Sequence, residues 1–105
     1  MPYRPEALLA LGDPTRLAIL EQLLDSPRAV VDLAEKLPIS RPGVSQHLRV
    51  LKNAGLVVDQ RVGNRRIYRV DPEGLAALRD QLGRFWEKAL TAYKVTVEQA
   101  NEEDV

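Results

Sequence analysis

Apolar side chains recur along the chain at the spacing of five helices and one β-hairpin. Between residues 31 and 54, two short helical patterns are separated by the turn-like segment Pro38-Ile39-Ser40. After Gly55 the pattern changes to alternation with β-branched residues, which continues to Val70. Gly63-Asn64 interrupts this run and is typical of a hairpin turn. The pattern predicts a winged helix-turn-helix, mainly α with a two-stranded wing, with the helix-turn-helix at 31–54 and the wing at 56–70.

The second of the two short helices has two different faces. Ser40 suits its N-cap, Pro42 its first turn and Gly55 its C-cap. At about 100° per residue, one side carries the apolar positions and the other gathers short polar and basic side chains. The apolar side holds Val44, Leu48 and Leu51 with His47 at its edge, and the polar side holds Pro42, Ser45, Gln46, Arg49 and Asn53. Arg, Gln, Asn and Ser bind base edges and phosphates, so we interpret this as a recognition helix rather than an ordinary amphipathic surface helix.

Three further elements precede the recognition helix. The sequence predicts a first helix from Pro5 to Leu11 and a second that is capped by Asp13 and opened by Pro14. We expect the apolar stripe of the second helix to comprise Leu17, Leu20, Leu23 and Leu24. Arg28-Ala29-Val30 is predicted to be extended, as a short strand, before a third helix over residues 31–37.

A long helix is predicted from Pro72 to about residue 100, with apolar residues at three- and four-residue steps from Leu75 to Val97. Such a helix is about 40 Å long, more than a small domain can cover by itself. We therefore expect a homodimer, in preference to a helix that lies wholly on its own domain. The predicted interface comprises Leu8, Leu11, Leu78, Leu82, Phe85, Trp86, Ala89 and Tyr93. The aromatic residues among them could also line a small-molecule pocket, although core and dimer packing explain them equally well.

The charge of the chain is divided unevenly. Overall it carries 15 Lys and Arg against 15 Asp and Glu. Residues 41–69 hold seven basic side chains and one acid, Asp59, which gives +6 and leaves −6 for the remainder. This basic block coincides with the recognition helix and the hairpin, as expected of a surface that binds DNA phosphates. The predicted DNA-binding residues are Ser40, Arg41, Pro42, Ser45, Gln46, Arg49, Lys52, Arg61, Asn64, Arg65 and Arg66.

The sequence leaves the register of the hairpin open. A three-residue loop from Gly63 to Arg65 is the preferred reading, because it places Asp59 opposite Arg69 and avoids opposing Arg61 to Arg66. Hairpins tipped with arginines are often only solvated surface, but this one follows the recognition helix directly.

Length and composition limit the other possibilities. A chain of 105 residues is expected to form one domain. It contains no cysteine, which excludes disulfides and thiolate metal ligands. No apolar run could cross a membrane and the first residues do not resemble a signal peptide, so we expect a cytoplasmic protein. No phosphate-cradling loop or nucleophile-base pair is present, and we expect neither an enzyme nor a bound cofactor.

From Leu11 to about Ala89 the chain resembles the ArsR/SmtB family of bacterial winged-helix repressors. The resemblance implies a homodimer that binds a pseudo-palindromic operator in double-stranded DNA and represses its own or a neighbouring operon until a signal releases it. The residues that carry the resemblance are Leu11-Gly12-Asp13-Pro14-Thr15-Arg16-Leu17-Ala18-Ile19-Leu20, Leu33-Ala34-Glu35-Lys36-Leu37, Val44-Ser45-Gln46-His47-Leu48-Arg49-Val50-Leu51, Ala54-Gly55-Leu56-Val57 and Gly63-Asn64-Arg65-Arg66-Ile67-Tyr68-Arg69-Val70.

The chain departs from this family at the metal sites. The family's founding members sense metals through a Cys pair at the start of the third helix, or through Asp and His on the last helix. Here the first segment reads Val30-Val31-Asp32-Leu33 and the last helix has no histidine. The single His47 is expected to be a packed, hydrogen-bonded residue, so we predict a metal-independent regulator. The alternatives are a small-molecule- or metal-responsive repressor of the same fold, and a winged-helix protein-interaction module.

Overall fold

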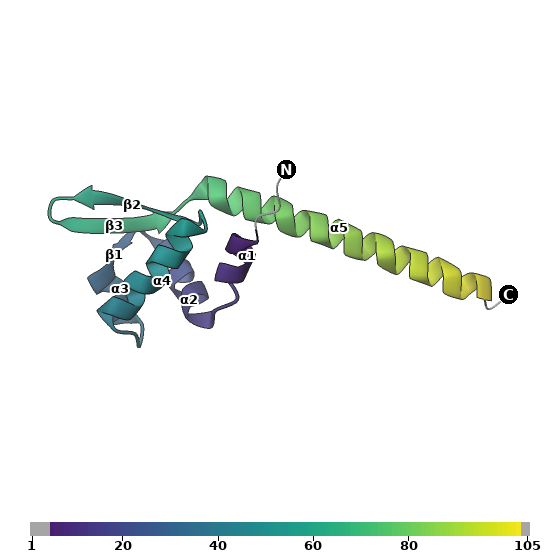
Figure 1. Cartoon of the computed structure of the whole chain (residues 1–105), viewed down its shortest axis with the longest axis horizontal. Coiled ribbons are helices and arrows are strands. Elements are labelled where there is room, and N and C mark those ends of the chain that lie inside the picture. The colour runs from purple at the N-terminus through teal and green to yellow at the C-terminus, as the bar shows by residue number, and fades with distance from the viewer. Residues whose placement is uncertain (1–4, 104–105) are drawn as a thin grey trace. The chain divides into compact units, whose positions relative to one another are not determined.

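A computed structural model of the chain describes residues 5–103. The elements are α1 (Glu6–Ala10), α2 (Pro14–Asp25), β1 (Arg28–Ala29), α3 (Val30–Lys36), α4 (Arg41–Asn53), β2 (Val57–Val62), β3 (Arg65–Val70) and α5 (Pro72–Glu103) (Figure 1). The chain divides into two compact units, residues 1–75 and 76–105, and α5 begins in the first and continues through the second. The fold class is therefore the predicted one, mainly helical with a small antiparallel sheet.

Helix α2 begins, and helix α4 begins and ends, where the capping residues predict. Asp13 Oδ1 accepts hydrogen bonds from the amide nitrogens of Thr15 and Arg16, at 2.8 and 3.2 Å, and begins α2. Ser40 Oγ accepts one from Gly43 N at 3.2 Å and begins α4. Gly55 follows α4 with a φ of +79°, the left-handed conformation that ends many helices and that glycine adopts without steric cost. Ser40 and Gly55 thus determine where the recognition helix begins and ends.

The core of the first unit forms around the apolar side of α4. Val44, Leu48 and Leu51 are all 0% exposed, as the helical periodicity predicted. Helix α4 contacts α1, α2, α3 and β2, and the other buried apolar residues of this unit are Ala10, Ile19, Leu20, Leu23, Ala29, Leu33, Leu56 and Val57. Fully burying a Val or Leu side chain is worth about 1.5–3 kcal/mol, so this cluster holds α4 in one rotational setting.

The predicted stripe of α2 was partly wrong. Leu20 and Leu23 are buried, but Leu17 and Leu24 are exposed. The buried side of α2 is formed instead by Ile19, Leu20 and Leu23, and Ile19 is 0% exposed. The apolar residues of α2 cover more than half of its circumference, so their spacing alone did not decide which of them face inward.

The short strand predicted before the third helix pairs with the two-stranded wing, so the sheet has three strands, in the order β1-β3-β2, and all pairs are antiparallel. The short strand β1 pairs Arg28 with Tyr68 and Ala29 with Ile67. It stops there because α3 begins at Val30, one residue earlier than predicted. The side chain of Asp32 accepts a hydrogen bond from Ala29 N at 3.1 Å and so stabilises this first turn.

The preferred hairpin register was also wrong. The loop has two residues, Gly63 and Asn64, and Arg61 lies opposite Arg66. Gly63 has a φ of +64° while Asn64 has no positive φ, as in a type II′ turn. The two arginines tolerate this position because both guanidinium groups have other partners. Arg61 Nε donates to the carbonyl of Gly63 at 3.2 Å, and Arg66 Nη1 donates to Asp59 at 2.7 Å.

The start of α5 lies directly against the end of the recognition helix. Asp71 N donates to the carbonyl of Leu56 at 2.9 Å, and Asp71 Oδ1 accepts from Glu73 N at 3.1 Å. One turn into α5, Gly74 approaches the backbone so closely that a Cβ there would overlap the carbonyl oxygen of Gly55. Only glycine fits this contact, which joins α5 to the C-cap of α4.

We predict that Gly74→Ala destabilises the protein despite the higher helix propensity of alanine. The obstructing atoms belong to backbone, so the chain must shift, at a cost of about 1–3 kcal/mol or more. The matched control is Gly83→Ala in the same helix, where no atom lies within 4 Å of the added Cβ. That change should stabilise by about 0.5–1 kcal/mol. Urea unfolding of both variants would measure the difference, and equal midpoints would show that the approach at Gly74 is unimportant.

Candidate nucleic-acid interface

The side of α4 opposite the core is open to solvent. Arg41, Ser45, Gln46 and Arg49 are all exposed, whereas the apolar residues between them are buried. Ser40 and Pro42, at the start of the helix, are exposed as well. The structure therefore brings together the predicted base-reading residues on one accessible face, and the burial of Val44, Leu48 and Leu51 determines which way they point.

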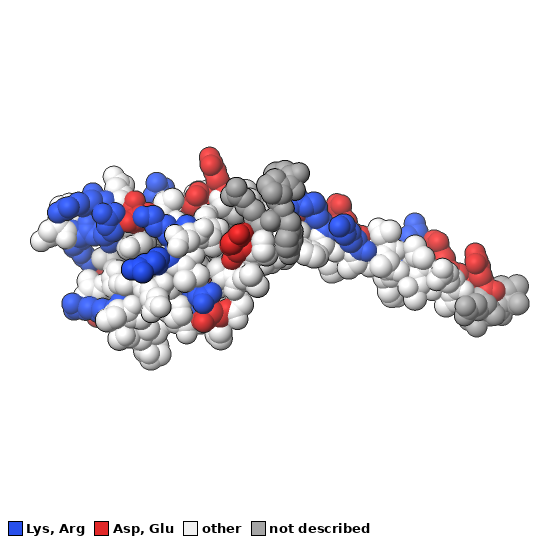
Figure 2. Space-filling view, in the orientation of Figure 1, with Lys and Arg blue, Asp and Glu red and all other residues white. Residues whose placement is uncertain are grey.

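The hairpin carries the rest of the predicted site. Arg61, Asn64, Arg65 and Arg66 are all exposed and lie on or beside the turn between β2 and β3. In Figure 2, Lys and Arg side chains gather over the hairpin and the neighbouring side of the first unit. A basic hairpin next to a helix with hydrogen-bonding side chains is the arrangement with which winged-helix domains contact DNA.

Several of these cations already have acidic partners. Arg65 Nη2 lies 2.8 Å from Asp32 Oδ2, and both side chains are partly exposed. Lys52 Nζ lies 2.7 Å from Asp59 Oδ1, and Arg66 Nη1 lies 2.7 Å from Asp59 Oδ2. From the sequence, Asp59 was expected opposite Arg69, and its pairing with Lys52 and Arg66 was missed. The sequence did contain a signal for this role, because Asp59 is the single acid among the basic residues between positions 41 and 69.

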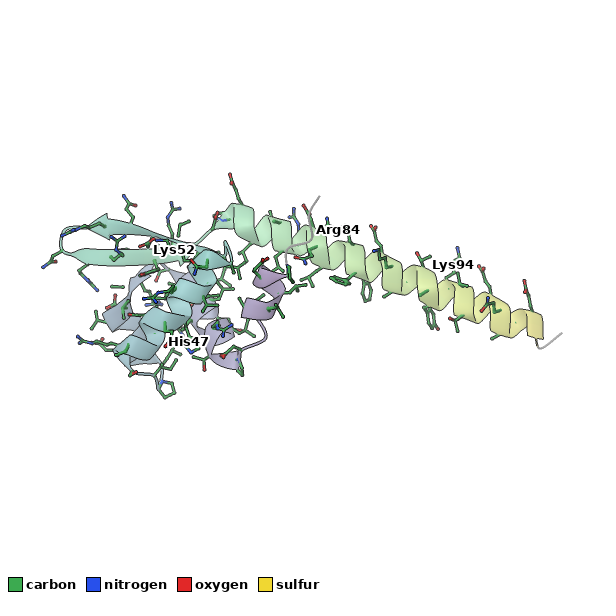
Figure 3. All side chains as sticks on the ribbon, in the orientation of Figure 1. His47, Lys52, Arg84 and Lys94 are labelled. Carbon is green, nitrogen blue, oxygen red and sulfur yellow. The ribbon has the colours of Figure 1, made fainter. Side chains whose placement is uncertain are left out.

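Asp59 is the most enclosed charged side chain among these ion pairs. Its side chain is 6% exposed, while those of Lys52 and Arg66 are 52% and 54% exposed. The hydrogen bond from Lys52, followed by that from Arg66, holds the pKa of the Asp59 carboxyl below its ordinary value. The carboxylate therefore remains charged at neutral pH, with one cation on each oxygen. Figure 3 shows Lys52 at the hairpin end of α4 and His47 nearer the middle of the same helix.

His47 has a structural environment, as predicted. It is half-buried, and its Nδ1 accepts a hydrogen bond from Arg16 Nε at 3.3 Å. Arg16 also donates to the carbonyl of Ala10 at 3.3 Å and lies 3.8 Å from Asp13. Backbone hydrogen bonding from Arg16 is the main cause that lowers the pKa of the Asp13 carboxyl. This group links α1, α2 and α4 through polar contacts beside the core.

The residues predicted at a dimer interface differ in accessibility. Leu8 and Leu11 are half-buried, Leu78 is 5% exposed and Ala89 is exposed. The second unit presents a row of large apolar side chains to solvent, in which Trp86 and Tyr93 are 65% and 68% exposed. The other exposed members of this row are Leu82, Phe85, Leu90 and Val97.

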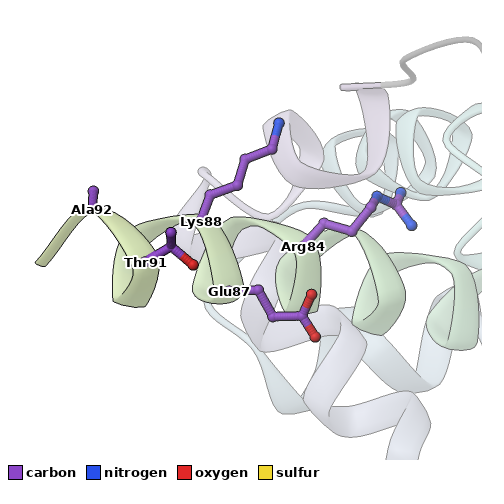
Figure 4. Close-up of a pocket in the computed structure, with 5 residues that line it drawn as sticks. All are labelled: Arg84, Glu87, Lys88, Thr91 and Ala92. Carbon is purple, nitrogen blue, oxygen red and sulfur yellow. The ribbon is translucent and has the colours of Figure 1, made fainter. Parts of the chain in front are cut away.

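A shallow depression lies on another side of α5. It is lined by Arg84, Glu87, Lys88, Thr91 and Ala92, all from this one helix (Figure 4). A depression formed by a single helix has no opposite wall and cannot enclose a ligand. Among residues 5–103, no cluster of three or more His, Cys, Asp or Glu side chains is placed to hold a metal ion. Within the same range, no helix is long and apolar enough to span a membrane.

These features define a winged helix-turn-helix protein with a candidate DNA-binding surface on α4 and the β2–β3 hairpin. Residues 13–58 match the sequence profile of the family described as bacterial regulatory protein, arsR family. The chain belongs to this family and is a DNA-binding transcriptional regulator. The resemblance to the ArsR/SmtB family is thereby confirmed, and the family consists of regulators rather than enzymes.

Curated relatives extend the match beyond this segment. The HTH-type transcriptional regulator Rv2034 of Mycobacterium tuberculosis is 61% identical over 84 residues, which are 80% of this chain and 78% of the relative. The HTH-type transcriptional repressor SmtB of the same species is 45% identical over 71 residues, 68% of this chain. The match spans about half, 53%, of the length of SmtB.

Solved structures share the fold. A possible transcriptional regulator for arsenical resistance has a TM-score of 0.72 at 43% identity, covering 77% of this chain and 84% of that one. The winged helix-turn-helix DNA-binding domain of Mb0332 from Mycobacterium bovis, described as homodimeric, has a TM-score of 0.65 at 32% identity. That match covers 81% of this chain and 79% of the other. The predicted fold class is confirmed by both.

Proposed function

We propose that this protein is a homodimeric, metal-independent repressor that binds a pseudo-palindromic operator of its own or a neighbouring operon, in the cytoplasm. The observation that carries the proposal is the coincidence of two exposed surfaces in the first unit. One is the polar face of α4, with Ser45, Gln46 and Arg49, and the other is the arginine-bearing hairpin. An α-helix fits the major groove, where each base pair presents a distinct pattern of donors and acceptors.

Within this surface we assign different roles to helix and hairpin. Gln46 and Arg49 are the side chains suited to base edges, since Gln pairs with adenine and Arg with guanine through two hydrogen bonds. Near the start of the helix, Gln46 and Arg49 are bordered by Ser40, Arg41, Pro42 and Ser45. Arg61, Asn64, Arg65 and Arg66, on the hairpin, are suited to phosphates or to the minor groove of adjacent DNA.

The dimer is supported by the exposed apolar row of α5. Trp86, Tyr93, Phe85 and Leu82 are each at least 46% exposed in the single chain, and an uncovered row of this kind on a soluble protein usually marks an interface. A two-fold dimer buries the same patch on both subunits and presents two recognition helices to two half-sites. The similar winged helix-turn-helix domain of Mb0332 from M. bovis is described as homodimeric, which supports a dimer for this chain.

We predict that Trp86→Glu or Leu82→Glu produces monomers. A charge in a paired apolar row would have to be buried without a partner, so the dimer should dissociate, and operator affinity should fall roughly 100-fold because the linked second half-site is no longer bound. Thr91→Glu introduces the same charge on the side of α5 away from this row and should remain dimeric. Sedimentation velocity would measure the state of each variant. Dimers of unchanged strength in the Trp86 and Leu82 variants would place the interface elsewhere.

We predict that Arg49→Ala reduces the sequence preference of DNA binding, whereas Arg65→Ala reduces the affinity for all sequences. The first should cost about 1–3 kcal/mol on the operator and relax preference at one base position in each half-site. The second should weaken operator and scrambled DNA alike and lower the salt slope by about one for each phosphate that is no longer neutralised. Affinities of both variants for both duplexes, across a salt series, would test the assignment. An intact specificity ratio in Arg49→Ala would show that this side chain does not read bases.

We predict that metals leave DNA binding unchanged. The chain has one histidine and no cysteine, too few of the ligands that transition-metal sites require. Adding zinc, nickel or a chelator should alter operator affinity by less than about twofold, whereas allosteric coupling in regulators is typically 5–150-fold. A saturable loss of binding at one metal ion per subunit would contradict metal independence.

A further inference from the structure

An enclosed carboxylate lies in the middle of the basic surface, where it opposes the attraction of DNA. The side chain of Asp59 is 6% exposed, and Asp59 is the single acid among residues 41–69. Burying a charged group is unfavourable unless it is fully paired, and here each carboxylate oxygen has its own cation at 2.7 Å. The pairing explains how the fold tolerates the charge. The pairing does not by itself explain why a surface proposed to bind phosphates contains an acid.

The two cations come from different elements and are held side by side. Lys52 lies in the last turn of α4, one turn after Arg49, and Arg66 lies on β3. Asp59 lies opposite Tyr68, so Arg66 is its diagonal neighbour on the same face of the hairpin. Because Lys52 binds Oδ1 and Arg66 binds Oδ2, the carboxylate fixes both cationic groups at the junction of recognition helix and wing.

Both cations keep donors for a further anion. A lysine ammonium has three N–H donors and an arginine guanidinium has five, and Asp59 uses only part of them. More than half of each side chain remains exposed. The three groups together carry a net charge of +1, which matches one backbone phosphate. Long side chains lose conformational entropy when they bind, and here the carboxylate has already ordered them.

We propose that Asp59 is a positioning residue that holds Lys52 and Arg66 as a preformed clamp for a single DNA phosphate. The inference rests on the proposed DNA-binding function and specifies how one phosphate is held. It assigns Lys52 and Arg66 to one shared contact instead of two independent ones. It also gives Asp59 a favourable role in binding a polyanion, contrary to the sign of its charge.

The sign of the effect of Asp59→Asn separates this proposal from simple electrostatics. If only net charge matters, removing an acid strengthens binding to any duplex and steepens the salt dependence. If Asp59 positions a clamp, Asp59→Asn weakens binding by about 3- to 30-fold, the reduction expected from releasing two ordered side chains. The slope of log affinity against log salt should then become shallower by about 0.9 for each subunit.

A charge-matched variant makes the comparison stricter. Lys52→Gln combined with Asp59→Asn keeps the +1 charge of the group but removes the clamp. Net charge alone predicts wild-type affinity for this double variant, and the clamp predicts affinity as weak as that of Asp59→Asn. Asp32→Asn is the control, because Asp32 also pairs with a hairpin arginine but holds only one cation and is 39% exposed. It should bind DNA as tightly as the wild type or more tightly.

The measurement is the fluorescence anisotropy of a labelled random-sequence duplex with the full chain, across a salt series. The duplex has about 30 base pairs, long enough for both recognition helices of a dimer to contact it. Tighter binding by Asp59→Asn, wild-type affinity in the double variant, or equal weakening by Asp32→Asn would overturn the clamp. Should Asp59→Asn fail to fold, Lys52→Gln, Arg66→Gln and the two changes combined alter half-exposed side chains instead, and all three must lower the slope by the same amount. A combined variant that lowers the slope twice as much as each single one would show two independent contacts and overturn the clamp. A single variant with an unchanged slope would overturn the proposal. A wild-type chain that binds no duplex would instead refute the proposed function itself.

Discussion

The burial of one side of α4 is the constraint on which the rest of the structure depends. Val44, Leu48 and Leu51 are completely enclosed by residues from α2, α3 and β2. Because they recur at three- and four-residue steps, their burial leaves no rotational freedom for the helix. Ser45, Gln46 and Arg49 then point outward as a consequence of packing. A base-reading helix needs this rigidity, since a hydrogen bond to a base edge loses strength steeply when its geometry is displaced.

The hairpin and the start of α5 both contact the C-terminal end of α4. Gly55 ends the helix in the left-handed conformation, Leu56 accepts the hydrogen bond from Asp71, and Gly74 packs against the carbonyl of Gly55. Lys52, in the last turn, reaches Asp59 on the hairpin. The end of the recognition helix is thus joined to the wing by charge and to the start of α5 by close backbone packing. Both joints involve contacts that few other residues could replace.

Local signals in the sequence predicted the elements well, and long-range contacts were predicted less well. Asp13, Ser40 and Gly55 are read correctly because a cap acts on residues that are only a few positions away. The hairpin register was missed because only residues directly opposite each other were considered. Arg66 instead reaches diagonally to Asp59, which removes the repulsion from Arg61. The exposed positions of α2 were missed because Leu17 and Leu24 share the apolar character of the residues that are buried.

The partners of the basic residues change how the surface charge is understood. Seven cations in residues 41–69 suggest a strong and indiscriminate attraction for DNA. Three of them, Lys52, Arg65 and Arg66, are already compensated by Asp59 and Asp32. Compensation of Arg65 by the partly exposed Asp32 lowers the part of the affinity that is independent of sequence, whereas the enclosed Asp59 is proposed to order Lys52 and Arg66 for one shared phosphate. For a regulator that must leave a vast excess of nonspecific sites, a smaller electrostatic contribution raises the weight of base reading in the choice of site.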